Sequence, residues 1–226
     1  MLYVVPTPIG NLEDITLRAL EVLRSVDVVA CEDTRTSGKM LNHFGITTPR
    51  VSYHDHNERK RAPDLISRMK AGSRVALISD AGTPGISDPG FYLVRECHRN
   101  DIEVVVLPGA SAVLPALVAS GLPSDRFAFE GFLPPKKGRA SRLQNIAREP
   151  RTVVLYESPH RILKTLKQLE DVCGADRPVS VARELTKQYE EVLRGTLESV
   201  RDILAGRERQ RGEFVIVLGG ASGTAG

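Results

Sequence analysis

Two carboxylates, Asp80 and Asp88, lie in a segment of twelve residues, 79–90, that contains three glycines and two prolines. The apolar run 75–78 before it is typical of a buried strand, and the amphipathic run 91–97 after it is typical of a helix. Glycine and proline make such a loop stiff and sharply turned, and the glycines let a ligand approach the backbone. Open α/β sheets bind ligands at the carboxyl ends of their strands, so we expect a binding site here. An ordinary strand-to-helix turn is the alternative, but it would need only one or two of these residues.

Three further strand ends in the first half of the chain carry loops rich in glycine, proline or carboxylate, namely residues 6–11, 32–35 and 108–112. Parallel strands place such loops on one edge of a sheet, so we expect the loops to converge. A G-x-G-x-x-G fingerprint and a P-loop lysine motif are both missing, which disfavours a usual dinucleotide or nucleoside-triphosphate site. The G-x-S-x-G motif of many serine hydrolases is missing too.

The segment His54-Asp55-His56 raises the question of a metal site. Two histidines two apart on a strand point the same way, but no third ligand stands at a recognisable spacing. A polar wall of a substrate cleft, or a surface turn, is the better interpretation. A metal-dependent phosphohydrolase that uses Asp55, Asp80 and Asp88 is a minor alternative, and we expect no metal.

Basic residues form two clusters, and each by itself could be a solvated face. The first comprises Arg59, Lys60, Arg61, Arg68, Lys70 and Arg74; the second comprises Lys136, Lys137, Arg139, Arg142, Arg148 and Arg151. Two clusters on either side of one candidate cleft favour binding to a phosphate backbone. The formal net charge of +3 is too small to establish a nucleic-acid partner without this distribution.

Strands alternate with helices up to residue 121, which predicts an α/β domain over residues 1–121 with a mainly parallel sheet. The pattern then changes, and residues 122–219 read as a second α/β domain with antiparallel character. Residues 220–226 are small and polar and read as a flexible tail. The amino terminus reads as a first strand and not as a leader peptide, and the three distant cysteines fit no disulfide framework. A cytoplasmic protein is therefore expected.

Several motifs resemble those of the small-subunit ribosomal RNA methyltransferases, which belong to the tetrapyrrole-methylase-like class of S-adenosylmethionine enzymes. The matching segments, which run from residue 2 to about residue 219, are 2–12, 31–35, 52–58, 79–90, 108–112, 131–134, 156–161 and 182–187. The resemblance implies two α/β domains, a mainly parallel amino-terminal sheet and a mixed carboxyl-terminal sheet, with the cofactor in the cleft between them and usually a homodimer. It also implies methylation of a cytidine ribose 2′-oxygen in 16S rRNA of the small ribosomal subunit.

The same resemblance implies a set of cofactor contacts in both domains. These are Pro8, Thr83, Ile86, Ser111, Ala112, Tyr156, Ala182 and Glu213. Two alternatives remain open: a methyltransferase of the same fold that acts on a tetrapyrrole, and a non-catalytic RNA-binding assembly protein. The two basic clusters argue against the tetrapyrrole, because a macrocycle needs an apolar trough.

A ribose hydroxyl is a poor nucleophile until its proton begins to leave, so the proposed reaction calls for a general base. Asp33 and Asp88 are the favoured candidates, with Asp55, Glu157 and Lys187 as others, although Asp33 and Asp88 could each be a helix N-cap or loop brace. For RNA binding, the expected contacts are Arg35, Arg61, Lys136, Lys137, Arg139 and Arg161. Arg35 could instead pair with Glu32 or Asp33, and the basic segment 134–151 is the expected RNA clamp.

Overall fold

The computed structural model describes residues 1–221 and divides into two compact units. The first unit comprises Met1–Ser111, and the second begins at Ala112. The boundary predicted from the sequence lies after residue 121, ten residues further on. The difference concerns α5 (Val113–Ser120), a helix that packs on the strands of the second unit and therefore belongs with it.

The first unit is built on a five-stranded parallel sheet in the order β3-β2-β4-β1-β5. Its strands are β1 (Leu2–Val4), β2 (Val28–Cys31), β3 (Arg50–Ser52), β4 (Val75–Ile78) and β5 (Val104–Val106). Every residue of β2 and β4 is buried, as expected of strands covered on both faces. The predicted parallel sheet is confirmed.

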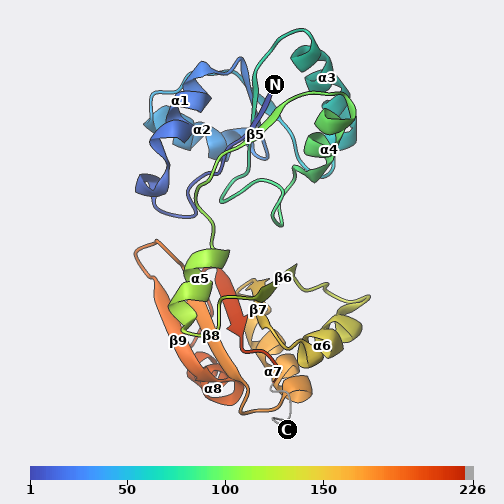
Figure 1. Cartoon of the computed structure of the whole chain (residues 1–226). Coiled ribbons are helices and arrows are strands. Elements are labelled where there is room, and N and C mark those ends of the chain that lie inside the picture. The colour runs from blue at the N-terminus through green and yellow to red at the C-terminus, as the bar shows by residue number, and fades with distance from the viewer. Residues whose placement is uncertain (222–226) are drawn as a thin grey trace. The chain divides into compact units, whose positions relative to one another are not determined.

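Helices cover both faces of this sheet (Figure 1). They are the short 3-10 helix η1 (Leu12–Asp14), α1 (Leu17–Ser25), α2 (Thr34–His43), α3 (Glu58–Lys70) and α4 (Phe91–Arg99). Apolar residues of α1 and α2 pack with Val29, Ala76 and Ile78. Apolar residues of α3 and α4 pack with Ala30 and Leu77, which are the sequence neighbours of Val29, Ala76 and Ile78. Since neighbouring residues of a strand point to opposite faces, this second core lies on the other face of the sheet.

The second unit is built on a mixed sheet in the order β6-β7-β10-β8-β9. Its strands are β6 (Phe127–Phe132), β7 (Thr152–Glu157), β8 (Pro178–Arg183), β9 (Glu191–Thr196) and β10 (Phe214–Leu218). Only β6 and β7 pair in parallel, and the other neighbours pair antiparallel. The predicted antiparallel character is confirmed, and with it the two-sheet α/β fold class.

One face of this second sheet is covered by α6 (Arg139–Arg148), α7 (Ile162–Cys173) and α8 (Leu197–Ala205), whose leucines and isoleucines form its core with β7, β8 and β10. The helix α5 packs on β8, β9 and β10 from the opposite side (Figure 1). The predicted tail 220–226 begins within the described residues, where the Ala221 amide donates a hydrogen bond to the Glu149 carbonyl oxygen. Residues 222–226 lie outside them.

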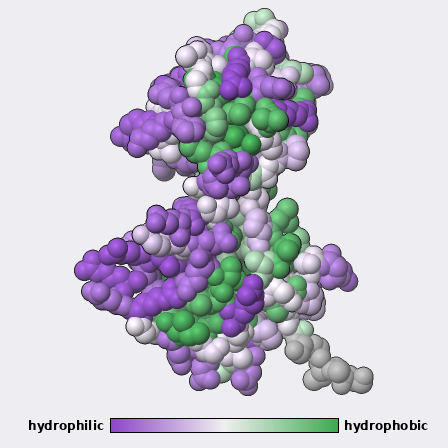
Figure 2. Space-filling view, turned by 90° about the vertical axis from the view of Figure 1, so that its left-hand side faces the viewer, coloured by the Kyte–Doolittle hydropathy of each residue, from purple (hydrophilic) through white to green (hydrophobic). Residues whose placement is uncertain are grey.

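Hydrophobic residues also reach the surface, and each unit shows a patch of them on the face in Figure 2. Large exposed apolar side chains are Leu12, Leu17, Ile86, Phe91 and Val106 in the first unit, and Leu114, Val118, Phe132, Tyr189 and Ile203 in the second. Among residues 1–221, no helix is long and apolar enough to cross a membrane.

Candidate active site

The predicted convergence of loops at the carboxyl edge of the first sheet is confirmed for residues 6–11, 80–90 and 108–112. Thr7 and Gly82 exchange backbone hydrogen bonds of 2.9 and 2.8 Å. The hydroxyl of Thr83 donates to the Ala110 carbonyl oxygen at 3.2 Å. The central loop is therefore tied on both sides, and the three loops form one backbone-lined surface.

Glycine is required where these loops approach each other most closely. A Cβ atom on Gly109 would lie 2.7 Å from the Pro6 Cβ, so any larger residue would push the first and last loops apart. Gly90 has a φ of +150°, and a Cβ there would lie 3.0 Å from the Gly85 amide nitrogen. At both positions glycine allows segments of the loops to pack closely against each other.

The cofactor contacts expected in the first unit lie on this surface. Pro8 is buried, Thr83 and Ser111 are half-buried, and Ile86 is 45% exposed. Thr83 is one of the residues that join the loops, so its backbone is fixed. Ala112 follows at the start of the second unit, where it precedes α5.

Carboxylates gather beside the loops, at the ends of β2, β3 and β4. The backbone amide of Asp33 donates a hydrogen bond to Asp80 Oδ1 at 3.2 Å, which joins two of the strand ends. Burial, and then the nearby charges of Glu32, Asp80 and Asp55, together raise the pKa of Asp88 to about 6. The pKa values of Glu32 and Asp80 are raised as well, by burial first and then by neighbouring carboxylates.

Asp33 has the opposite electrostatic environment. It is the N-cap of α2, and its carboxylate accepts hydrogen bonds from the Arg35 amide at 2.8 Å and from the Arg35 guanidinium at 2.9 and 3.2 Å. Bonding to Arg35 lowers the pKa of Asp33 to about 2. The N-cap alternative and the Asp33–Arg35 pair are thus both observed. Asp88 does not cap α4, because Gly90 holds that position.

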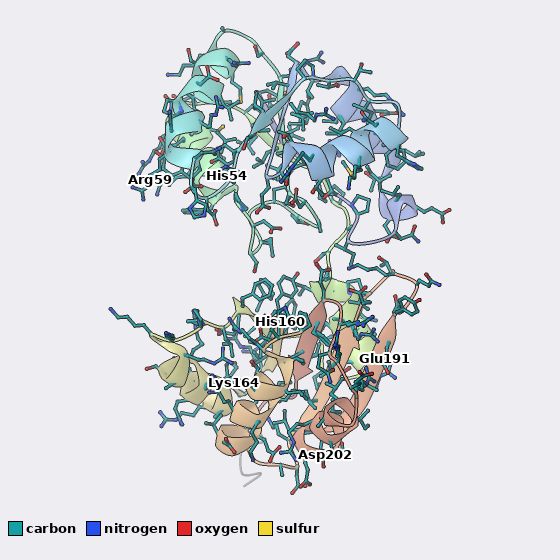
Figure 3. All side chains as sticks on the ribbon, turned by 180° about the vertical axis from the view of Figure 1, so that it is seen from behind. His54, Arg59, His160, Lys164, Glu191 and Asp202 are labelled. Carbon is teal, nitrogen blue, oxygen red and sulfur yellow. The ribbon has the colours of Figure 1, made fainter. Side chains whose placement is uncertain are left out.

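The His54-Asp55-His56 segment lies before α3, and Figure 3 shows His54 close to Arg59 at that end of the helix. The His54 Nε2 atom lies 3.1 Å from Nδ2 of the Asn57 side chain. Within residues 1–221, no group of three or more histidine, cysteine or acidic side chains is placed to hold a metal ion. The arrangement is compatible with a polar wall of a substrate cleft and equally with a surface turn.

The contacts expected in the second unit are partly grouped. Tyr156 on β7 and Ala182 on β8 both pair with Val215 on β10. The three residues therefore lie side by side, on the face of the sheet against which α5 packs. Ala182 is buried. Glu213 stands just before β10, where its side chain is 76% exposed and accepts a 2.9 Å hydrogen bond from Lys187.

Two of the expected RNA contacts have guanidinium groups that form bonds inside the second unit. Arg139 is 6% exposed and donates to Gln168 Oε1 at 2.8 Å, to Thr165 Oγ1 at 2.7 Å and to the Pro134 carbonyl at 3.2 Å. Arg161 pairs with the fully buried Glu157 at 3.0 Å and donates to the Leu133 carbonyl at 2.6 Å. Both arginines hold the loop that follows β6.

The other expected RNA contacts lie at the surface. Lys136 and Lys137 stand in the loop after β6, Arg61 lies on α3, and Arg35 has a side chain that is 88% exposed although it pairs with Asp33. Neither lysine forms an ion pair with any residue among 1–221. The second basic cluster thus contains the buried Arg139, the exposed lysines, and two exposed arginines, Arg142 and Arg151, that pair with Glu130 and Glu149.

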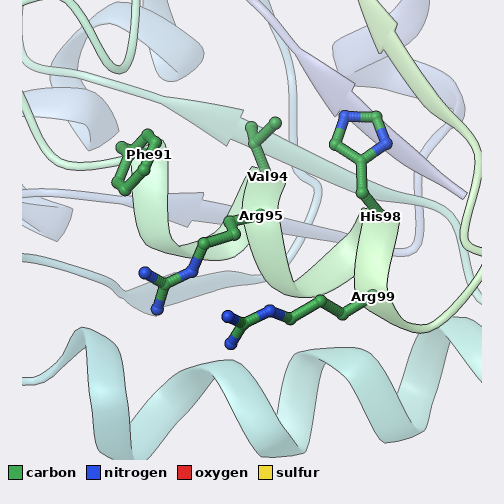
Figure 4. A pocket seen from close by; sticks show the side chains of 5 residues that line it. All are labelled: Phe91, Val94, Arg95, His98 and Arg99. Carbon is green, nitrogen blue, oxygen red and sulfur yellow. The ribbon is translucent and has the colours of Figure 1, made fainter.

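A shallow hollow on α4 adds cationic residues that the sequence analysis did not single out (Figure 4). Phe91, Val94, Arg95, His98 and Arg99 line it. The Arg95 guanidinium lies 4.9 Å from the Tyr92 ring centre and 5.6 Å from that of Phe91. Since α4 packs beside α3, these arginines extend the first basic cluster. In the sequence, the spacing of four residues between Arg95 and Arg99 already indicated that the two side chains lie on one face of a helix.

A family model described as Tetrapyrrole (Corrin/Porphyrin) Methylases matches residues 1–201. The chain belongs to this family. It is also 52% identical over 223 residues to the ribosomal RNA small subunit methyltransferase I of Synechocystis, a match that covers 98% of this chain and 80% of that protein. The resemblance predicted from the motifs, and the expectation that the chain is a methyltransferase, are confirmed.

Solved structures share the fold at lower identity. A diphthine synthase superposes with a TM-score of 0.73 at 19% identity, covering 96% of this chain and 89% of its own. The uroporphyrin-III C-methyltransferase of Thermus thermophilus, solved in complex with S-adenyl homocysteine, gives a TM-score of 0.65 at 22% identity and covers 96% of each chain. At these identities the comparison establishes the two-sheet architecture.

Proposed function

We propose that the chain transfers a methyl group from S-adenosylmethionine to the ribose 2′-oxygen of a cytidine in 16S rRNA of the small ribosomal subunit. The observation that carries the proposal is the 52% identity, over 98% of the chain, to a ribosomal RNA small subunit methyltransferase I. The exposed lysines and arginines of both units supply the charge that an RNA backbone requires. We further propose a cytoplasmic homodimer, since the substrate is the small ribosomal subunit and the family resemblance implies two copies.

The cofactor supplies an electrophilic methyl group on a positively charged sulfur. The loops of the first unit fit such a molecule, because the neighbouring carboxylates favour a cation. We propose contacts from Pro8, Thr83, Ile86 and Ser111 in the first unit. In the second unit, the proposed contacts are Ala112, Tyr156, Ala182 and Glu213.

Between the two candidate bases, the electrostatics favour Asp88. A general base works best when its pKa lies near the operating pH, and the pKa of Asp88 is raised to about 6. With a pKa lowered to about 2, the Asp33 carboxylate is a weak proton acceptor and is already engaged by Arg35. We therefore assign Asp88 the role of removing the ribose proton and Asp33 the role of fixing the start of α2 and the position of Arg35.

The proposed RNA contacts are Arg35, Arg61, Lys136 and Lys137, all of them exposed. Arg139 and Arg161 act indirectly, because they hold the loop that carries the two lysines. Of the segment 134–151, which was the expected RNA clamp, we propose that the exposed loop with Lys136 and Lys137 contacts the RNA.

The decisive experiment gives purified protein and labelled S-adenosylmethionine to small ribosomal subunits from cells that lack this protein, and maps the modified nucleotide by mass spectrometry. We expect one cytidine that carries a ribose methyl group. Saturable binding of S-adenosylmethionine in calorimetry separates this function from a non-catalytic assembly role. Label on a base, or only on a tetrapyrrole offered in parallel, would overturn the proposed substrate.

A further inference from the structure

Aromatic side chains gather on one face of β6 and β7 in the second unit. The Tyr156 ring lies 5.1 Å from the Phe129 ring and 5.5 Å from the Phe132 ring, measured between ring centres. The register pairs Phe129 with Val154 and Phe132 with Tyr156, so all of these side chains share a face. It is the face opposite Val153 and Leu155, which belong to the core under α6, α7 and α8.

The outermost ring of this group is open to solvent. Phe132 is 54% exposed, whereas Leu133 beside it is 1% exposed, because the two point to opposite sides of the chain. Among the strands of residues 1–221, β6 pairs with β7 alone and is an edge strand, and α5 packs on β8, β9 and β10. Because Phe132 stands at the edge of a group of three rings, its exposed face offers a flat aromatic surface to a binding partner.

Positive charge follows the rings along the chain. Lys136 and Lys137 follow Phe132 by four and five residues, and both are exposed. Their loop is fixed in place, because Arg161 donates to the Leu133 carbonyl oxygen and Arg139 to that of Pro134. Glu157, fully buried, anchors Arg161 in turn. The surface thus combines a rigid aromatic edge with unpaired cations, which is the composition that binds single-stranded nucleic acid.

We propose that Phe132, supported by Tyr156 and Phe129, stacks an unpaired base of the substrate RNA, while Lys136 and Lys137 hold the adjacent phosphates. The inference deepens the proposed function and rests on it. A ribose 2′-oxygen within a folded RNA becomes accessible only when its strand is splayed, and a stacking partner stabilises a base that has left its neighbours. An apolar occupant, such as a second copy of the chain, would not account for the two lysines.

The test measures the binding of a single-stranded oligocytidylate that contains one fluorescent pyrrolocytosine. Phe132→Ala should weaken binding by about 5- to 150-fold, the effect of losing one stacked base. Phe132→Trp should bind the oligocytidylate about as tightly as wild type, because stacking requires an aromatic ring and not phenylalanine in particular. Ile203→Ala is the matched control, since Ile203 is 50% exposed on α8, on the other face of the sheet.

Salt dependence separates stacking from charge. Phe132→Ala should leave the slope of log affinity against log salt unchanged, whereas the double variant Lys136→Ala, Lys137→Ala should lower it by about 0.7 for each lysine. Unchanged affinity in Phe132→Ala would overturn the proposal. So would a lower affinity for S-adenosyl homocysteine or an altered sedimentation coefficient, which would assign the ring to the cofactor or to a second copy. The wild-type mapping experiment tests the proposed function separately.

Discussion

Asp33 and Asp88 are both carboxylates at strand ends of the first sheet, yet their surroundings move the pKa values in opposite directions. The Arg35 guanidinium and amide stabilise the charged form of Asp33. Asp88 is half-buried near three other carboxylates, and both the partial burial and these charges disfavour its charged form. Environments that separate the pKa values of two like groups also separate their roles, one structural and one chemical.

The raised pKa of Asp88 predicts the pH dependence of methyl transfer. The base must be ionised to accept a proton, so the single-turnover rate should fall as the pH drops through about 6 and level off above pH 7. Asp88→Asn should lose about 10²- to 10⁴-fold in rate and also lose this dependence. Asp33→Asn should retain the inflection near pH 6. A wild-type rate in Asp88→Asn would remove Asp88 from the mechanism.

The same shift predicts an effect on stability. The pKa of Asp88 in the folded state, about 6, lies above the ordinary value of 3.8. Between pH 3.8 and pH 6, therefore, the Asp88 carboxyl keeps its proton in the folded protein but has lost it in the unfolded chain. The contribution of Asp88 to stability is therefore greatest below pH 4 and declines as the pH rises through 6. After allowance for screening by water, Asp88→Asn should stabilise the protein at pH 7 by about 1 kcal/mol. Urea unfolding at pH 7 and pH 4 measures this, and the gain should vanish at pH 4.

At the scale of the elements, the loop after β6 is held by side chains that the sequence suggested for another purpose. Glu157 at the end of β7, Arg161 just before α7 and Arg139 at the start of α6 form a buried polar network. Two of its bonds end on backbone carbonyls of the loop. The network therefore couples the position of Phe132 and the lysines to the packing of two helices.

Arg139→Ala should destabilise the second unit by about 1–3 kcal/mol, because it leaves the Gln168, Thr165 and Pro134 partners of the guanidinium without a bond in a buried site. Lys136→Ala in the same loop should change stability by less than about 0.5 kcal/mol, since Lys136 is exposed. Thermal unfolding of the two variants provides the comparison. Equal stability in Arg139→Ala and wild type would contradict the structural role assigned here.

At the scale of the whole molecule, the proposed cofactor contacts belong to two units that each have their own sheet and core. Binding energy from the two units would be used to position the reactants, which is the main contribution a protein can make to an in-line transfer.

Hydrogen exchange with and without S-adenosylmethionine tests this division of the contacts. We expect added protection in residues 80–90 and 108–112 of the first unit and around Tyr156 and Ala182 of the second. At a hundredfold excess over Kd, the ligand should also raise the free energy of unfolding by about 2.7 kcal/mol. Protection confined to one unit would show that the other does not contact the cofactor.

The sequence by itself determined the alternation of strands and helices, the loops at the strand ends and the family motifs, because these depend on local residue types and spacing. Only the tertiary structure decided which cations are free: Arg139 and Lys136 belong to one basic run, but packing against α7 buries the first and leaves the second in water. It also raised the pKa of Asp88, because the fold buries it near Glu32 and Asp55, which are distant in the chain, whereas Arg35, which lowers the pKa of Asp33, stands only two residues from it. Burial and charge are properties of the assembled fold, and no local pattern specifies them.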